Sequence, residues 1–181
     1  RLQKGKKQFE RVNISNQTDE GSGLSVNAIA EDSEGRIWIA SDNTLKVFET
    51  ASSILNSWTL PNSGNIIQSI LVDTHNTVWM ATKSGLFRLD ISKDSDKTKA
   101  VPSLVGAPIP KDADVSTLYQ KSPDEIWGGS QSDGLFYLNT KTGESKHFLH
   151  LTARRGTLSD NRVRSIFIDH ANVLCVGTSI G

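Results

Sequence analysis

A segment of 41 to 48 residues recurs along the chain, and this repeat limits the fold more than any other feature of the sequence. One column of the repeat holds a tryptophan three times and a cysteine once: Trp38, Trp79, Trp127 and Cys175. A small side chain follows two residues later, and a hydroxyl comes next: Ala40, Ala81, Gly129 and Gly177, then Ser41, Thr82, Ser130 and Thr178. Nine residues before the first column lie Ile29, Ile70, Leu118 and Ile166. Agreement in four columns across four copies indicates one structural unit that is built four times.

Each copy has the pattern of short β-strands separated by turns rich in Asp, Ser, Gly and Asn. In the first copy, strands are predicted at 29–32, 37–40, 45–48 and 57–60. No stretch of 11 or more residues has the periodicity of a helix. Four short antiparallel strands that recur at this interval are typical of a propeller blade. We therefore predict an all-β chain of about four blades, in which the tryptophan column fills the space between sheets and the small residue lets the sheets approach closely.

The blade repeats are expected at approximately 24–60, 66–92, 114–149 and 158–181, with a linker at 93–113. The fourth copy is incomplete, and the chain opens at Arg1 rather than at a methionine. Residues 1–181 are therefore expected to be a partial propeller, a fragment of a larger one. The sequence leaves the number of blades in the parent open.

Two segments carry a specific family resemblance: Ile29 to Ser41 (IAEDSEGRIWIAS) and Val78 to Leu86 (VWMATKSGL). They resemble the two-component-regulator propeller repeat, and the likeness extends from about Phe9 onward except for 94–113. The resemblance implies the periplasmic sensor region of a hybrid histidine kinase or a GGDEF-type diguanylate cyclase, anchored in the inner membrane. It implies no output activity within this chain. Three positions depart from the repeat, where Lys121 replaces an aspartate, Cys175 a tryptophan and Thr44 a glycine.

Candidate ligand-binding residues follow from the topology of a blade. If the first strand of each blade is innermost, the loops that lead into it share one face with the loops between the second and third strands. Polar groups that converge at such a face are suited to binding a ligand or a partner. We call these loops the loop face, and its candidate residues are Asn27, Asp42, Asn43, Gln68, Lys83, Gln131, Asp133, Arg162 and Arg164. The expected partner is a small solute or a glycan, or else a second copy of the parent receptor in a homodimer.

No catalytic or metal-binding set is predicted, and no cofactor is expected. His147 and His150 are three residues apart, a spacing that sends them to opposite faces of a strand. Cys175 lies in the column of buried tryptophans and is expected to be a small core residue. The Asp32 turn resembles the Asp-box of sialidase propellers, which is a structural turn.

Composition excludes several other classes of protein. Lysine plus arginine number 20, and aspartate plus glutamate also number 20, a balance that argues against nucleic acid as a partner. No apolar run is long enough to span a bilayer, so this chain is not expected to be embedded in a membrane.

The leading hypothesis is therefore a non-enzymatic sensor module. The alternative is a fragment of a propeller-fold carbohydrate-active enzyme, either a sialidase-like hydrolase or a lyase, whose clustered catalytic groups would have to lie outside this sequence. A purely structural spacer is a third interpretation.

Overall fold

The computed structural model describes residues 25–48, 54–91, 100–106 and 109–180, and these residues form β-strands without any helix. Sheet 1 has the strand order β1 (Val26–Glu31), β2 (Ile37–Ser41), β3 (Thr44–Phe48) and β4 (Ile54–Thr59). Sheet 2 has the order β5 (Ile67–Val72), β6 (Thr77–Thr82), β7 (Gly85–Asp90) and β8 (Ser103–Leu104). Sheet 3 has the order β9 (Val115–Ser122), β10 (Glu125–Ser130), β11 (Leu135–Asn139) and β12 (Ser145–Phe148). Sheet 4 has two described strands, β13 (Val163–Ile168) and β14 (Leu174–Thr178).

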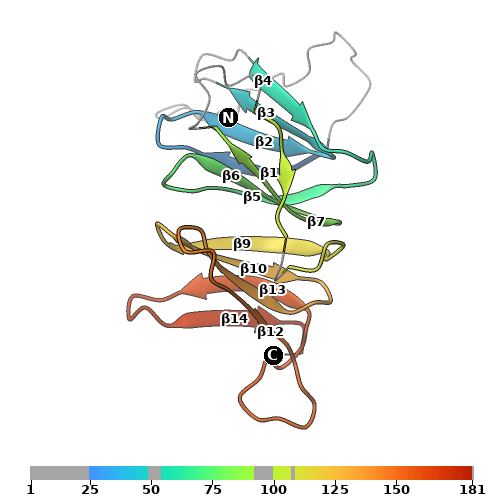
Figure 1. The fold of residues 1–181 in the computed structure, drawn as a ribbon, viewed down its shortest axis with the longest axis vertical. Helices are drawn as coiled ribbons and strands as arrows, with labels where there is room; N and C mark the ends of the chain where they lie inside the picture. Colours follow the sequence, from blue (N-terminus) through green and yellow to red (C-terminus); the bar gives the residue numbers. More distant parts are fainter. Residues whose placement is uncertain (1–24, 49–53, 92–99, 107–108, 181) are drawn as a thin grey trace, which may run out of the picture.

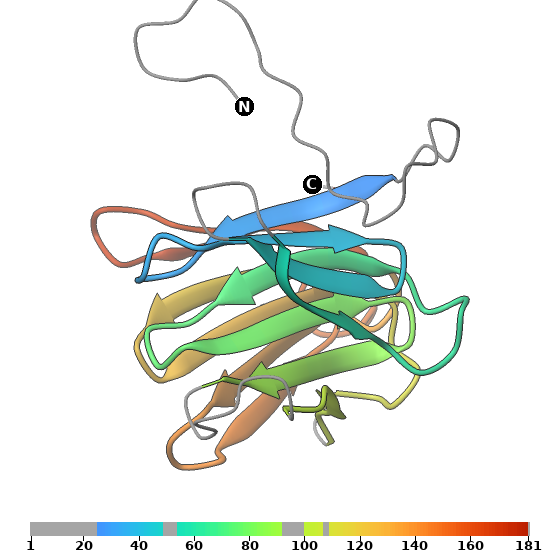
Figure 2. The same ribbon diagram turned by 90° about the horizontal axis from the view of Figure 1, so that it is seen from above.

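The four sheets are stacked in the order of the sequence, from sheet 1 at the top of Figure 1 to sheet 4 at the bottom. All their strand pairs are antiparallel, as predicted. The first strands lie next to one another, since β1 contacts β5, β5 contacts β9 and β9 contacts β13. Figure 2 looks along the stack and shows successive sheets covering one another. The first strand of each sheet is therefore the inner strand.

Three apolar clusters fill the junctions between successive sheets. Trp38 of sheet 1 shares a cluster with Ile67 and Ile70 of sheet 2. Trp79 of sheet 2 lies with Val115 and Ile126 of sheet 3. Trp127, which is partly buried, lies with Val163 and Ile166 of sheet 4. Each junction thus pairs the tryptophan column of one sheet with the aliphatic column of the next, which confirms the role predicted for the tryptophans.

The small residue beside each tryptophan permits close approach of the next sheet, most clearly at Gly129. A Cβ atom built on Gly129 would lie 2.5 Å from Cγ1 of Val163 and 2.8 Å from its Cβ. It would also lie 2.9 Å from Cγ2 of Thr117 on the neighbouring strand. Real carbon atoms do not approach so closely, so glycine at this position sets the spacing between sheets 3 and 4.

Two expectations need correction. Residues 93–113 are more than a linker, because β8 lies within them and pairs with β7. β8 has only two residues, both exposed, and so short a strand has no apolar alternation to reveal it. Cys175 is exposed rather than buried in a core. In the other three copies the residue in this column faces the next sheet. Among the described residues, no sheet is stacked on that side of sheet 4.

Candidate functional site

The turn that follows the inner strand is held by an aspartate side chain in the first, second and fourth copies of the repeat. Oδ1 of Asp32 accepts hydrogen bonds from the backbone N–H groups of Glu34 and Arg36. Its Oδ2 accepts one from Nε of Arg36 at 2.6 Å and one from the indole N–H of Trp38 at 2.8 Å. Asp32 is buried, so these four bonds supply the partners that water would otherwise provide. The predicted structural role of this turn is therefore visible in its bonding.

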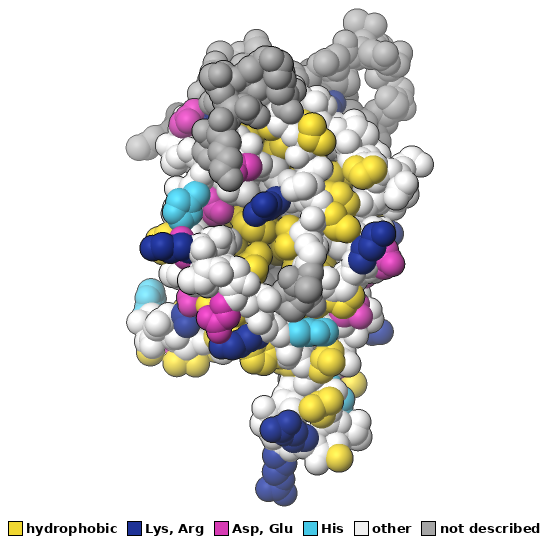
Figure 3. Space-filling view, in the orientation of Figure 1, with side chains coloured by type: hydrophobic (Ala, Val, Ile, Leu, Met, Phe, Trp, Pro, Cys, Tyr) yellow, Lys and Arg dark blue, Asp and Glu magenta, His cyan; other side chains and the backbone are white. Residues whose placement is uncertain are grey.

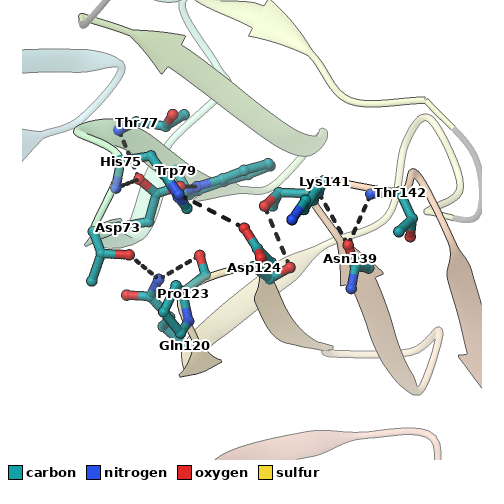
Figure 4. A network of polar contacts seen from close by, with 12 residues as sticks. Asp73, His75, Thr77, Trp79, Gln120, Pro123, Asp124, Asn139, Lys141 and Thr142 are labelled. Carbon is teal, nitrogen blue, oxygen red and sulfur yellow. Dashed lines mark hydrogen bonds and ion pairs between the residues drawn. The ribbon is translucent and has the colours of Figure 1, made fainter.

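Asp73 repeats this arrangement in the second copy (Figure 4). Its Oδ1 accepts the N–H groups of His75 and Thr77, and its Oδ2 accepts the indole N–H of Trp79 at 2.8 Å. The aspartate thus fixes the tryptophan that lies six residues further on. The same network reaches the next sheet, where Nε2 of His75 lies 3.7 Å from Oδ1 of Asp124.

The pairing of aspartate with tryptophan fails in the two copies where one member is replaced. Lys121 takes the place of the aspartate in the third copy, and the buried indole N–H of Trp127 has no hydrogen-bond partner. Cys175 takes the place of the tryptophan in the fourth copy, where Oδ1 of Asp169 still accepts the N–H of Val173. The aspartate turn and the tryptophan are therefore separable parts of the repeat: the third copy keeps the tryptophan, and the fourth copy keeps the aspartate.

Acid is expected to weaken the Asp32 turn. Burial raises the pKa of Asp32, but the hydrogen bonds from Trp38 and Arg36 outweigh it and hold the pKa below its ordinary value. The ordinary value, about 3.9, applies to the unfolded chain. The stabilisation is therefore complete above that pH and is lost as the pH falls through the folded-state pKa. Thermal melts from pH 6 to pH 2 should show a gap between wild type and Asp32→Asn that closes toward acid. Asp112→Asn, at an exposed position, is the control, and a gap that does not change with pH would contradict the prediction.

Each inner strand carries a β-bulge at the same column of the repeat. The register shifts between Val26 and Ala28, Ile67 and Ser69, Val115 and Thr117, and Val163 and Ser165. The extra residues at these shifts are Asn27, Gln68, Ser116 and Arg164. A bulge redirects the side chain of the extra residue, and here the column carries polar groups. We call it the bulge column.

The bulge column bonds each sheet to the next one. Nδ2 of Asn27 donates to the carbonyl of Ile67 at 3.1 Å. Nε2 of Gln68 donates to the carbonyl of Val115 at 3.0 Å and also to Oδ1 of Asp114. The hydroxyl of Ser116 lies 3.5 Å from the carbonyl of Val163. The acceptors occupy equivalent positions, each being the first residue of the next inner strand.

Two predicted ligand-binding residues, Asn27 and Gln68, therefore have partners within the protein.

Replacing Gln68 with alanine should lower the free energy of unfolding by about 1 kcal/mol, because the hydrogen bonds to sheet 3 are lost. Lys83→Ala, at an exposed position on the same loop face, should change it by less than about 0.5 kcal/mol. Urea denaturation measures both. An equal loss in the two variants would show that the Gln68 bonds contribute nothing.

The structure brings the rest of the predicted set to one end of the strands. The N–H of Lys83 donates to the carbonyl of Ile66, and that of Gln131 donates to the carbonyl of Asp114. The carbonyl of Asp42 accepts the N–H of Ile67 of the next sheet. The two kinds of loop therefore do share one face. Asn43 bonds the carbonyl of Leu60 through its side chain, and Asp133 accepts from the hydroxyl of Ser132.

Arg162 and Arg164 both bond Gln131 on the loop face. NH1 of Arg164 donates to Oε1 of Gln131 at 3.1 Å, and Nε of Arg162 lies 3.4 Å from the carbonyl of Gln131. Both arginines are exposed. Asp114 and Ser116 also lie here, and the sequence analysis did not include them. The residues before Asp114 have no strand pattern, so the sequence did not show that β9 begins beside Gln68.

Neither a metal site nor a membrane-spanning helix occurs in the described parts of the chain. No group of three or more His, Cys, Asp or Glu side chains among them could hold a metal ion. No described segment forms a helix able to cross a bilayer. Figure 3 shows acidic and basic side chains interspersed on the face in view, with exposed hydrophobic side chains among them.

The stacked antiparallel sheets, with their inner strands side by side, are blades of a β-propeller. Residues 20–43 match the family model described as "two component regulator propeller". The chain thus carries a propeller repeat of the two-component regulator type, and the matched residues include the Asp32 turn and Trp38. A search of curated proteins finds no match.

Solved structures share the fold at low sequence identity. The extracellular domain of the putative one component system BT4673 from B. thetaiotaomicron has a TM-score of 0.69 and 20% identity, over 87% of this chain and 21% of that one. The extracellular domain of the putative hybrid two component system BT3049 from the same organism gives 0.65 and 22%, over 87% and 20%. A catalytically inactive virginiamycin B lyase from Staphylococcus aureus gives 0.67 and 17%, over 93% and 52%. The chain thus spans about a fifth of the extracellular domains that it matches.

Proposed function

We propose that this chain is part of an extracytoplasmic sensor module in a bacterial signalling receptor of the two-component or cyclic-di-GMP type. The two-component regulator repeat at residues 20–43 is the observation that carries the proposal. The fold shared with extracellular domains of putative one component and hybrid two component systems supports it. In this role the chain lies in the periplasm, as part of a receptor held in the inner membrane, and any kinase or cyclase activity belongs to other parts of that receptor.

The loop face is the surface we assign to sensing. The residues in the repeated columns pack or hydrogen-bond between sheets, so their role is to stabilise the fold. The exposed side chains of Lys83 and Arg162 are on the loop face and vary between copies of the repeat. Function on a repeated scaffold resides in such variable loops. We propose a small solute or a glycan as the ligand and no catalytic role for this chain.

A binding and turnover assay tests the proposal. The purified chain is titrated by calorimetry with a panel of oligosaccharides and small polar solutes, and each mixture is then analysed for products. We expect binding without turnover, and a loss of binding in the Lys83→Ala/Arg162→Ala double variant at an unchanged melting temperature. Lys141→Ala, at an exposed position in the turn between β11 and β12 at the other end of the strands, is the matched control. Turnover of any compound would contradict the non-catalytic role. Binding that survives in the double variant would move the sensing surface away from these loops.

A further inference from the structure

Two arginines of sheet 4 reach the same glutamine of sheet 3. Arg162 directly precedes β13 and Arg164 is the second residue of that strand, whereas Gln131 directly follows β10. Nε of Arg162 lies 3.4 Å from the carbonyl oxygen of Gln131, and Nη1 of Arg164 donates to its Oε1 at 3.1 Å. The N–H of Gln131 is in turn fixed by the carbonyl of Asp114 at 2.8 Å. Two positive charges therefore meet at the loop-face end of a junction whose two sheets both lie within the chain.

The charge of these two arginines is not neutralised within the described part of the chain. No described carboxylate forms an ion pair with either guanidinium. The acidic residues of the two adjoining loops have other partners. Oδ2 of Asp133 accepts the hydroxyl of Ser132 at 2.8 Å. Oδ1 of Asp160 accepts the backbone N–H of Arg162 at 2.9 Å. Like charges that are held close to one another repel, and a bound anion would remove that repulsion.

The two arginines offer hydrogen-bond donors as well as charge. A guanidinium has five N–H groups, and the described residues occupy one of them on Arg162 and two on Arg164. Both side chains are exposed, so a ligand can reach the others. The candidate residues of the loop face include no aromatic side chain on which a neutral sugar could stack. The group therefore suits an anion better than a neutral ligand.

We propose that Arg162 and Arg164 bind the carboxylate of an acidic ligand, either a sugar acid or another small organic acid. The inference rests on the proposed function, because it names the chemical class of the ligand that the loop face senses. The planar fork of a guanidinium matches the two oxygens of a carboxylate, and such charge-assisted pairs are among the strongest hydrogen bonds in proteins. Gln131 is a positioning residue, since both arginines are bonded to it.

Titrations of the ¹⁵N-labelled chain test the proposal. The ligands are glucuronate, its neutral analogue glucose, and succinate, an acid without a sugar ring. The Nε–H signals are followed in the ¹H–¹⁵N spectrum and are assigned by their loss in Arg162→Lys and Arg164→Lys. We expect at least one acid to shift both signals, glucose to shift neither, and higher ionic strength to weaken the response. A response to glucuronate alone would show that the sugar ring is recognised too, and a response to both acids that the carboxylate suffices.

Variants place the site at these residues. Arg162→Ala and Arg164→Ala should each weaken binding of the responding acid about tenfold, as expected for lost hydrogen bonds to a charged group. Arg155→Ala removes the same charge at an exposed position between β12 and β13, and should leave the affinity unchanged. Gln131→Glu should abolish binding without lowering the melting temperature, because the new carboxylate occupies the guanidinium groups itself.

The outcomes separate this inference from the proposed function. Glucose that shifts the signals as strongly as the acids would overturn the carboxylate site but leave sensing at the loop face intact. Acid binding that survives in both Arg162→Ala and Gln131→Glu would do the same, as would a neutral compound of the earlier panel that binds when neither acid does. If no acid and no compound of that panel binds, the inference and the proposed function both fail.

Discussion

Replacing Trp79 with alanine should lower the free energy of unfolding by about 3–5 kcal/mol. Trp79 is 2% exposed and lies in the cluster that joins sheets 2 and 3, so its removal leaves a large cavity in that junction. The substitution also deprives the buried Oδ2 of Asp73 of the indole N–H that it accepts. Equilibrium urea denaturation, followed by circular dichroism, measures the loss.

Trp127→Ala is the matched variant in the same column of the repeat. Trp127 is only partly buried, and its indole N–H has no partner, so its removal should cost less than that of Trp79. Trp79→Phe keeps an aromatic ring but removes the bond to Asp73, and should fall between wild type and Trp79→Ala. If Trp79→Ala and Trp127→Ala lowered the free energy of unfolding equally, the tighter burial of Trp79 and its bond to Asp73 would contribute nothing to stability, contrary to this prediction.

Gly129→Ala should destabilise the chain by about 1–3 kcal/mol although it adds a single methyl group. The new Cβ would collide with the backbone-proximal atoms of Val163, which belong to the inner strand of sheet 4 and cannot rotate away. Sheets 3 and 4 must then separate or shift. Because sheet 4 has no described neighbour on its other side, the loss should concentrate there. Compared with wild type, Gly129→Ala should accelerate amide hydrogen exchange more in β13 and β14 than in sheets 1 and 2.

Gly128 supplies the control within the same strand. A Cβ atom on Gly128 would lie 3.4 Å from Cδ2 of Leu118 and 3.7 Å from the carbonyl oxygen of Thr117, so a methyl group fits with small adjustments. Gly128→Ala should therefore be nearly neutral in stability and in exchange rates. If Gly128→Ala were as harmful as Gly129→Ala, the effect would reflect the loss of glycine flexibility in the strand and not the spacing between sheets.

Much of the fold could be predicted because its signals are local. The alternation in Ile29–Asp32 and the repeated spacing of Trp38 and Trp79 depend on neighbours along the chain, and they identified strands, blades and the column at the junctions. The exposure of Cys175 could not be predicted in this way. Its column is buried only when another sheet covers it, and that condition is a property of the stack rather than of the repeat.

The candidate site was predicted less completely than the fold. Topology placed the loops on one face, and the bonds between Lys83, Gln131 and their neighbours agree with that placement. Polar character alone could not separate residues that face water from residues that bond the next sheet. Gln68 looked like a ligand-binding residue, but its acceptor on Val115 lies 47 residues away along the chain. The bulge that directs Gln68 there leaves no mark in the amino-acid pattern.

The register of the repeat underlies every contact between sheets described above, and the indole N–H groups of the tryptophans report it directly. The measurement is the indole region of the ¹H–¹⁵N spectrum for wild type, Asp32→Asn, Asp73→Asn and Lys121→Ala. Asp32→Asn should shift the resonance of Trp38 and leave that of Trp79 in place, and Asp73→Asn should do the reverse, since each aspartate accepts the indole N–H of the tryptophan six residues further on. Trp127 should keep its position in both aspartate variants and change little in Lys121→Ala, because its indole N–H has no partner to lose. Aspartate substitutions that leave Trp38 and Trp79 unmoved, or that shift Trp127 instead, would contradict the register and with it the stacking of the four blades.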